Sequence, residues 1–364
     1  MSTSTFWSRF GFEEQDAAGC IRAVQDGIVG WRVREFEEQG WCSFTLVVER
    51  DAKTEGDTQG LGHHFNRDYN DSSSIIVQIR PAQHALDMSI TRAAEKTFPS
   101  LAPTIRSLDI DLPGGLHAYA MEKMPGAPLS RLLPHDQTAS PVFRTKHERL
   151  VRSFAAIIAQ SWRSSSKSIS NARYTRADSP MDDKQSMLSL CKGPVGSTIV
   201  SRLRKLGEEL PDAPLREIAK SALAKVQDLD DYPVVLNHGD LIPSNILVDE
   251  DTWDMTGLVD WAEAEYLPFG TCLYGLENLL GYSSDAGGFL YYENEGYLRD
   301  VFWACLFDTV PELKSRERDV RVMRDVGVLL WYGIAWDNGA IDRVVNEIKD
   351  GGEVACLRAF LGTG

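Results

Sequence analysis

The apolar residues of this 364-residue chain change their spacing near residue 125. Before that point, short segments alternate apolar and polar residues, as in WCSFTLVVER at 41–50, which is the pattern of half-buried strands. After it, apolar positions recur every three or four residues, as in HERLVRSFAAIIAQSW at 147–162, which is typical of an amphipathic helix. Strands followed by helices predict the α+β class, with a β-rich N-terminal lobe and a mainly helical C-terminal lobe.

These patterns divide the chain into a helical N-terminal extension, a β-rich lobe and a mainly helical lobe, predicted at residues 1–30, 31–124 and 125–364. Two polar, aperiodic stretches are expected to be loops, at 51–73 and 163–180. After Pro268 the pattern indicates helices as far as the C-terminus.

Charge and composition exclude several classes of protein. The formal net charge of −15 disfavours nucleic acid or an anionic membrane as the main partner and is compatible with a cationic substrate. No apolar run reaches the roughly 20 residues that a membrane span needs, and no secretory signal is visible. The six scattered cysteines form no metal-binding pattern, so we expect reduced thiols and a cytoplasmic location. The oligomeric state is left open by the sequence.

The most informative stretch is HGDLIPSNILVD, which begins at His238. Its skeleton, His-x-Asp-Leu-x-x-x-Asn, has the spacing of a protein-kinase catalytic loop, with Gly239 where those enzymes carry arginine. Phosphoryl transfer needs a carboxylate to orient the attacking hydroxyl and an oxygen ligand to hold a metal ion beside the phosphates. Asp240 fits the first role, as the catalytic residue, and Asn245 fits the second.

A second acidic motif, GLVDW, follows Asn245 at a distance that a hairpin can close. In the order loop, strand, turn, strand, carboxylate, the hairpin would bring Asp260 beside Asn245, where both could bind magnesium. A single Asp beside Gly is more often an ordinary turn residue, but the two motifs together favour the metal site.

These two strings resemble the signature of the aminoglycoside phosphotransferase and choline kinase-like family, over roughly residues 31–281. The resemblance implies a bilobal protein-kinase-like fold, ATP or GTP as donor with Mg²⁺, and a small-molecule acceptor that carries a hydroxyl and, in some members, an amine. It also implies that ATP lies between the lobes and that His238 stabilises the loop rather than acting as a base.

In the N-terminal lobe, the turn at Gly40 is expected to cover the phosphates, with Ser43 as a hydroxyl donor, although a plain β-turn explains it equally well. Arg80 occupies the place of the strand lysine that pairs with phosphate. Its supporting carboxylate would be Asp87 or Glu95, of which Asp87 is favoured. The alternative for Arg80 is a solvated cation on a surface strand.

The nucleotide and acceptor contacts beyond these are less well encoded. In the segment YAMEKMPG, the backbone groups of Glu122 and Met124 would bond adenine, an assignment that depends on chain order alone. Trp261 and Glu263 follow the metal-binding carboxylate and are expected to face the acceptor.

The predicted function is transfer of the γ-phosphate of ATP to a hydroxyl of a small molecule. A protein kinase is disfavoured because Gly239 replaces the loop arginine and no activation segment is recognisable. A catalytically weak nucleotide-binding or scaffold protein is the alternative, which Arg80 in place of lysine favours and the intact carboxylates oppose.

Overall fold

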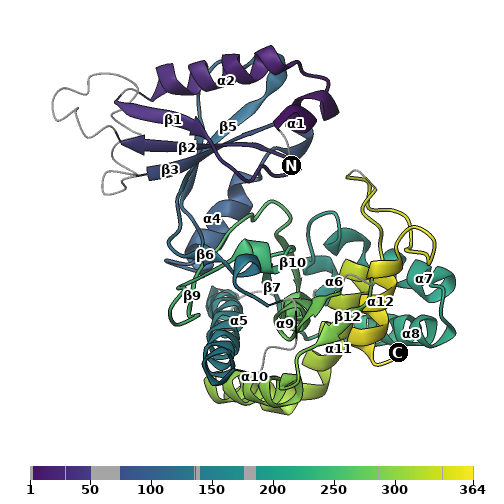
Figure 1. Ribbon diagram of the computed structural model, residues 1–364. Helices are drawn as coiled ribbons and strands as arrows, with labels where there is room; N and C mark the ends of the chain where they lie inside the picture. The colour runs from purple at the N-terminus through teal and green to yellow at the C-terminus, as the bar shows by residue number, and fades with distance from the viewer. Residues whose placement is uncertain are drawn as a thin grey trace. The chain divides into compact units, whose positions relative to one another are not determined.

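The structure is a computed structural model that describes residues 3–28, 30–50, 74–134, 136, 140–175, 186–284, 287–337 and 339–363. The chain divides into two compact units, Met1–Met124 and Pro125–Gly364. The first unit is sheet-rich and the second mainly helical, so the predicted α+β class is confirmed (Figure 1). The expected loop at 51–73 lies outside the described residues.

The N-terminal unit is built on a five-stranded sheet whose strands lie in the order β1-β2-β3-β5-β4, with every neighbouring pair antiparallel. Its elements are α1 (Thr3–Arg9), α2 (Glu14–Gly27), β1 (Trp31–Glu35), β2 (Phe44–Arg50), β3 (Ser74–Arg80), a 3-10 turn (Ala82–His84), α4 (Met88–Thr97), β4 (Ile105–Leu108), a 3-10 turn (Pro113–Gly115) and β5 (His117–Glu122).

The two faces of this sheet have separate cores, because successive side chains of a strand point to opposite faces. In β3, Ile75, Val77 and Ile79 join one core, to which α1 and α2 contribute apolar residues such as Phe6, Trp7 and Val24. Ile76 points to the other face and packs with Leu86, Ile105, Tyr119, Met121 and Met88. The N-terminal helices thus complete the core of the sheet and form one compact unit with it.

The C-terminal unit surrounds small strands with helices (Figure 1). Its strands are β6 (Ala127–Pro128), β7 (Val234–Asn237), β8 (Ile246–Val248), β9 (Met255–Leu258), β10 (Glu265–Pro268), β11 (Gly281–Ser283) and β12 (Phe289–Tyr291). Its helices are α5 (Pro141–Thr175), α6 (Met187–Leu190), α7 (Ile199–Glu209), α8 (Ala213–Asp228), α9 (Tyr274–Leu279), α10 (Glu295–Thr309), α11 (Glu317–Tyr332) and α12 (Gly351–Leu361). Its 3-10 turns span Leu129–Arg131, Gly196–Thr198, Pro243–Asn245, Thr271–Leu273 and Pro311–Arg316.

Two sequence-based expectations about this unit were wrong. Helix α5 continues to Thr175, through most of the polar stretch expected to be a loop, and residues 176–180 lie outside the described residues. Once a helix is anchored by packing, each further residue adds a backbone hydrogen bond, so polar residues can extend it. The region after Pro268 is not wholly helical either, because β11 pairs with β12.

Helix α9 is the element that three neighbouring helices hold in place. His147 of α5 lies 2.6 Å from the carbonyl oxygen of Leu279, at the end of α9. The fully buried carboxylate of Glu277 accepts hydrogen bonds from Arg299 of α10 (2.6 Å) and Arg324 of α11 (2.6 Å). Such a pairing is what allows a carboxylate to be buried while charged.

The pH dependence of stability should show the contribution of His147. A carbonyl oxygen can only accept, so Nε2 of His147 carries the hydrogen, and burial lowers the pKa of this imidazole from 6.5 to about 4. As the pH falls through this interval, the unfolded chain binds a proton that the folded chain does not bind, so stability falls. The loss should reach about 3 kcal/mol, since one pKa unit corresponds to about 1.4 kcal/mol.

A His147→Gln variant keeps an N–H donor for Leu279 and removes the titrating group. We therefore expect its urea-unfolding free energy to fall less steeply than that of the unmutated chain between about pH 6.5 and about pH 4.5. Equal slopes in the two proteins would show that His147 is not buried in its neutral form.

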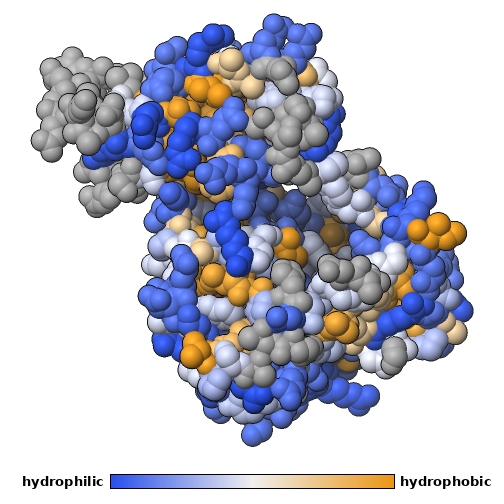
Figure 2. All heavy atoms as spheres, in the orientation of Figure 1, coloured by the Kyte–Doolittle hydropathy of each residue, from blue (hydrophilic) through white to orange (hydrophobic). Residues whose placement is uncertain are grey.

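The exposed hydrophobic residues do not form one large surface patch on the face shown in Figure 2. In Figure 2 the hydrophobic residues visible on this face form small separate patches among hydrophilic ones. In the described part of the chain, the large hydrophobic residues that are exposed are Val142, Leu190, Leu290, Tyr297, Trp336 and Ile348. None of the described helices combines the length and the apolar character needed to cross a membrane.

Candidate active site

The motif HGDLIPSN forms the connection between β7 and β8, and the predicted hairpin after it is confirmed. Strand β8 pairs with β9 with Ile246 opposite Leu258, and Val259 N–H donates to the carbonyl oxygen of Asn245 (3.0 Å). Asn245 directly precedes β8 and Asp260 closely follows β9, so both lie at the open end of the hairpin. The hydrogen-bonded ladder, rather than side-chain contacts, sets the distance between these two positions.

Asn245 holds Asp240 by two hydrogen bonds. Its Nδ2 donates to Oδ2 of Asp240 at 2.7 Å and to the carbonyl oxygen of the same residue at 3.0 Å. A single amide group thereby fixes both the backbone and the carboxylate of Asp240. Within the described part of the chain, Oδ1 of Asn245 accepts no hydrogen bond, so this oxygen can still bind a metal ion.

His238 joins the catalytic loop to the end of the hairpin. Its Nδ1 accepts from the N–H of Asp240 (3.3 Å), and its Nε2 lies 2.9 Å from the carbonyl oxygen of Val259. One nitrogen must accept and the other must donate, which is the pattern of a neutral imidazole. Burial lowers the pKa of His238 to about 4, against the opposing effect of Asp260. This geometry fits the loop-stabilising role and leaves no free nitrogen for a catalytic base.

Gly239 has a physical reason to replace the arginine of protein kinases. Its φ is +81°, a backbone conformation that L side chains rarely adopt. A Cβ at this position would also lie 2.0 Å from the carbonyl oxygen of Glu263. The close approach of these two backbone segments brings Glu263 toward the catalytic loop, so a larger residue at 239 would change the site itself.

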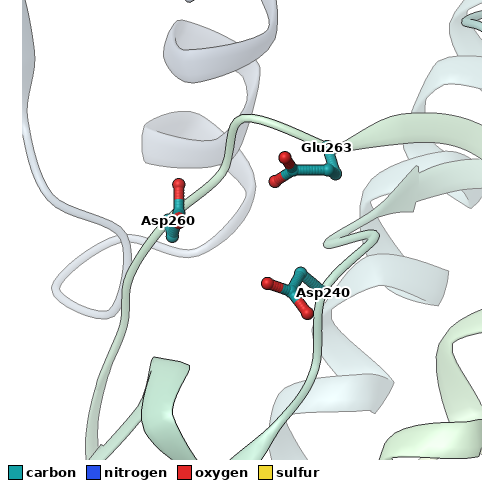
Figure 3. A group of neighbouring side chains, drawn as sticks. All are labelled: Asp240, Asp260 and Glu263. Carbon is teal, nitrogen blue, oxygen red and sulfur yellow. The ribbon is translucent and has the colours of Figure 1, made fainter. Parts of the chain in front are cut away.

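Three carboxylates meet at this point (Figure 3). One oxygen each of Asp240, Asp260 and Glu263 lies within 4.8 Å of the others, and the three side chains point toward a common space. Asp260 has a φ of +61°, which is uncommon for a residue other than glycine and costs of order 1 kcal/mol. The surrounding structure therefore holds Asp260 in an unfavourable backbone conformation at the place where its carboxylate faces the other two.

The clustering of negative charge has an electrostatic consequence. Burial raises the pKa of Asp240 to about 7, the nearby carboxylate of Asp260 contributes to the rise, and the hydrogen bond from Asn245 opposes it. A divalent cation would relieve this repulsion. Carboxylate and amide oxygens are the ligands that Mg²⁺ and Ca²⁺ prefer, so the donor set fits such an ion.

Trp261 differs from the acceptor-facing position expected for it. Its side chain is 3% exposed, its Nε1 donates to the carbonyl oxygen of Leu258 (2.8 Å), and its ring lies 4.4 Å from that of His238. The indole therefore packs in the interior, between the end of β9 and His238 of the loop. Glu263, in contrast, does face the common space of the carboxylates.

In the N-terminal unit, Arg80 is buried, which excludes the solvated surface cation considered as the alternative. It is 2% exposed, and its Nε donates to Oε1 of Gln78 (3.0 Å), two residues earlier on the same face of β3. Burial of an arginine implies compensating partners, so Arg80 belongs to an organised polar group rather than to the surface.

The two carboxylates considered as partners of Arg80 have other roles. Asp87, the favoured candidate, is the N-cap of α4 and accepts from the N–H and the hydroxyl of Ser89 (2.8 and 2.6 Å). Glu95 accepts from Thr104 (2.9 Å) and pairs with Arg106 (3.3 Å). The assignment of Asp87 to the nucleotide site is corrected accordingly, because an Asp directly before a helix satisfies free N–H groups of its first turn.

The connection between β1 and β2 carries the residues expected to cover the phosphates. Ser43 is buried, and its hydroxyl lies 3.3 Å from that of Thr45 rather than on the surface of the loop. A Cβ on Gly40 would lie 3.1 Å from Oγ of Ser43, so glycine allows a tight loop here. Gln39 fixes the same loop, since its side chain bonds both the N–H and the carbonyl oxygen of Thr45 (2.7 and 2.9 Å).

The segment expected to bond adenine lies at the end of β5. Glu122 is the last residue of this strand, and its N–H donates to the carbonyl oxygen of Thr104 (3.0 Å). Met124 is buried and ends the N-terminal unit.

The sequence analysis did not identify the residues of α9 that hydrogen-bond the loop containing Asp240. Tyr274 and Asn278 of α9 both bond the backbone of Leu241, the residue after Asp240. Their spacing of four residues places them on one face of a helix, but nothing in the sequence connects that face to residue 241.

A sheet-rich unit, a helix-rich unit and a catalytic loop whose Asp, Asn and second Asp meet at a hairpin define a kinase-like phosphotransferase. The family model described as "Phosphotransferase enzyme family" (APH) matches residues 71–271, more than half of the chain. The chain therefore belongs to the APH phosphotransferase family, as its sequence motifs predicted, and it is a small-molecule kinase.

Comparison with solved structures finds chains of low identity. An aminoglycoside-3'-phosphotransferase of type VIII is 13% identical, with 86% of this chain and 100% of that chain covered and a TM-score of 0.45. An amicoumacin kinase in complex with AMP-PNP, Ca²⁺ and Ami is 12% identical, with 98% of this chain and 95% of that chain covered and a TM-score of 0.48. A putative aminoglycoside phosphotransferase from Ralstonia eutropha is 13% identical over 96% and 97%, with a TM-score of 0.48. A search of curated proteins finds no match.

Membership of the family also establishes the cofactors. APH kinases use ATP with a divalent metal ion, which agrees with the prediction from the sequence. The carboxylate oxygens of Asp240, Asp260 and Glu263 lie close together and are suitable ligands for such an ion.

Proposed function

We propose that this kinase transfers the γ-phosphate of ATP to a hydroxyl group of a small molecule, with Asp240 as the catalytic carboxylate. The observation that carries the proposal is the geometry of Asp240, whose carboxylate Asn245 holds at 2.7 Å and which faces Asp260 and Glu263 within 4.8 Å. A carboxylate fixed in this way can receive the hydrogen bond of an acceptor hydroxyl without a cost of reorganisation.

In the proposed reaction, the acceptor oxygen forms a bond to the γ-phosphorus as the bond from that phosphorus to the ADP oxygen breaks. Asp240 orients the acceptor hydroxyl and takes its proton, and ADP leaves with the electron pair of the broken bond. Positioning and charge stabilisation supply most of the rate, because phosphoryl transfer asks little covalent chemistry of the protein.

Asn245, through Oδ1, and Asp260 would hold magnesium. The metal ion, when bound, compensates the charge of the phosphates. His238 and Trp261 would act indirectly by keeping the loop and the end of the hairpin together, since His238 contacts both and Trp261 packs on it.

The N-terminal unit is proposed to supply nucleotide contacts. Arg80, buried beside Gln78, is suited to bind phosphate, since its planar guanidinium can donate two parallel hydrogen bonds. The loop at Gly40 and the backbone of Glu122 and Met124 remain proposed contacts for the phosphates and for adenine. Ser43 is left out of this set because its hydroxyl faces Thr45.

The acceptor is proposed to carry an amine as well as a hydroxyl. The carboxylates of Asp240, Asp260 and Glu263 face one space, and such a cluster attracts a cationic group. An ammonium group of the acceptor would be favoured in this space, and the overall charge of −15 favours the approach of a cation. The cytoplasmic location expected from the cysteines is part of the same proposal.

The proposal is tested by incubating the chain with magnesium and ATP, or GTP in parallel, and two pools of metabolites. One pool contains amino alcohols and the other contains neutral polyols, and mass spectrometry detects any phosphorylated product. We expect magnesium-dependent product from the amino-alcohol pool. Product from neutral polyols alone would refute the proposed amine of the acceptor but not the transfer reaction.

Nucleotide binding without any product or release of ADP would contradict the proposed function. That result would favour the alternative of a nucleotide-binding or scaffold protein, in which the carboxylates bind a metal ion without turnover.

A further inference from the structure

The peptide groups that follow Asp240 have no regular secondary structure to bond them. Leu241 is 2% exposed and lies in the loop between β7 and the 3-10 turn before β8. A buried N–H or carbonyl group without a partner costs about 1 to 3 kcal/mol, so both groups of Leu241 need partners from elsewhere in the fold.

One helix supplies both partners. The N–H of Leu241 donates to the hydroxyl oxygen of Tyr274 (2.9 Å), and the carbonyl oxygen of Leu241 accepts from Nδ2 of Asn278 (3.2 Å). Tyr274 and Asn278 are one turn apart on α9, and a Cβ on Gly275 between them would lie 2.8 Å from Cβ of Leu241. The bond from Tyr274 acts on the peptide plane that joins Asp240 to Leu241.

The two side chains are themselves held in place by α11. Tyr274 is 3% exposed and stacks on Trp331, with ring centres 4.9 Å apart and planes 7° from parallel. The hydroxyl of the next residue, Tyr332, donates to Oδ1 of Asn278 (2.6 Å), which leaves the Nδ2 of Asn278 directed at Leu241. Side chains locked in this way can hold a backbone segment more tightly than flexible ones.

Asp240 is thus held from two directions. Asn245 bonds its carboxylate and its carbonyl oxygen, while α9 bonds the peptide that follows it. We propose that Tyr274 and Asn278 are positioning residues, which set the orientation of Asp240 by clamping Leu241 to α9. This inference depends on the proposed function, in which Asp240 is the catalytic carboxylate.

The test compares Tyr274→Phe with Tyr232→Phe. Both tyrosines are 3% exposed, and the hydroxyl of Tyr232 also makes a single backbone hydrogen bond, to the carbonyl oxygen of Phe269 (2.9 Å). In the described structure no hydrogen bond or ring contact joins Tyr232 to residues 238–245, so it is a matched control for the loss of one buried hydroxyl. ADP release from magnesium–ATP, with water as the acceptor, gives a readout that needs no knowledge of the natural acceptor.

We expect Tyr274→Phe to lower kcat by about tenfold to a hundredfold with little change in KM for ATP, because a small displacement of a catalytic group costs rate rather than ground-state binding. Tyr232→Phe should keep kcat within about twofold. It should lower the free energy of unfolding by about as much as Tyr274→Phe does. An Asn278→Asp variant, which keeps an acceptor for Tyr332 and loses the donor to Leu241, should lower kcat in the same direction.

A double-mutant cycle with Asp240→Asn separates this inference from the proposed function. If Tyr274 acts through Asp240, Tyr274→Phe should have no further effect on kcat in the Asp240→Asn background. The same loss in both backgrounds, or equal kcat for the Tyr274→Phe and Tyr232→Phe variants, would overturn the positioning role. Normal turnover of Asp240→Asn alone, or no ADP release by the unmutated chain with water or any pool, would instead overturn the proposed function.

Discussion

Replacement of Asp240 by asparagine is expected to lower turnover by about two to four powers of ten, the usual contribution of a positioned acid–base group. Asparagine has the same shape, and its oxygen can still accept the hydrogen bond from Nδ2 of Asn245, so the loop should keep its structure. The affinity for magnesium–ATP should change little, because Asp240 is proposed to act on the acceptor. Steady-state kinetics and calorimetric titration measure the two quantities separately.

Asp249→Asn is the matched control for this substitution. Asp249 ends the same sequence motif but is exposed, and its carboxylate bonds the backbone N–H groups of Asp251 and Thr252 in a turn (3.1 and 2.8 Å). Asparagine can accept the same bonds, so turnover and stability should both be retained. Near-normal turnover of Asp240→Asn on its acceptor would remove Asp240 from the catalytic role.

The second large effect is expected for Asp260. Asp260→Asn should weaken magnesium-dependent ATP binding at least about tenfold, since the loss of one charge-assisted interaction costs about 1.5 to 3 kcal/mol. Asparagine is preferred to alanine here, because at a φ of +61° asparagine is tolerated and alanine would add backbone strain. Titration of ATP with and without magnesium gives the metal-dependent part of the affinity.

Glu263→Gln distinguishes the metal from the acceptor. Glu263 lies in the same cluster as Asp260, but it is proposed to face the acceptor, so its variant should keep the magnesium dependence and raise KM for an amine-bearing acceptor. Equal loss of magnesium dependence in both variants would make Glu263 a metal ligand. An Asp260→Asn variant with unchanged magnesium dependence would place the ion elsewhere.

Much of the fold was predictable because it depends on local pattern. Alternation identified strand β2 of the N-terminal sheet, and helical spacing identified α5. The extension of α5 to Thr175 was not predictable, since its last turns are polar and depend on the packed part before them. The hairpin of β11 and β12 had a signal, a glycine-rich turn between two aromatic segments, which the apolar pattern around it obscured.

The partners of Arg80 show where prediction from spacing stops. Asp87 and Glu95 were the two carboxylates that the sequence offered, and both are engaged locally, Asp87 at the N-terminus of α4 and Glu95 with Arg106. Ser43 likewise faces Thr45 in the structure. In each case a nearby partner, rather than Arg80 or a phosphate group, sets the direction of the side chain.

The sequence by itself determined the catalytic loop and the hairpin, because the residues that define them lie close together in the chain, between His238 and Asp260. Asp240, Asn245 and Asp260 are brought together by a short loop and one strand pair, β8 with β9, in which Ile246 lies opposite Leu258. Only the tertiary structure decided that the carboxylate of Glu263 lies beside those of Asp240 and Asp260. It also decided that Tyr274 and Asn278 of α9 hydrogen-bond the backbone of Leu241. These contacts depend on close approach between segments, at Gly239 and at Gly275, and such distances are set by packing rather than by local sequence.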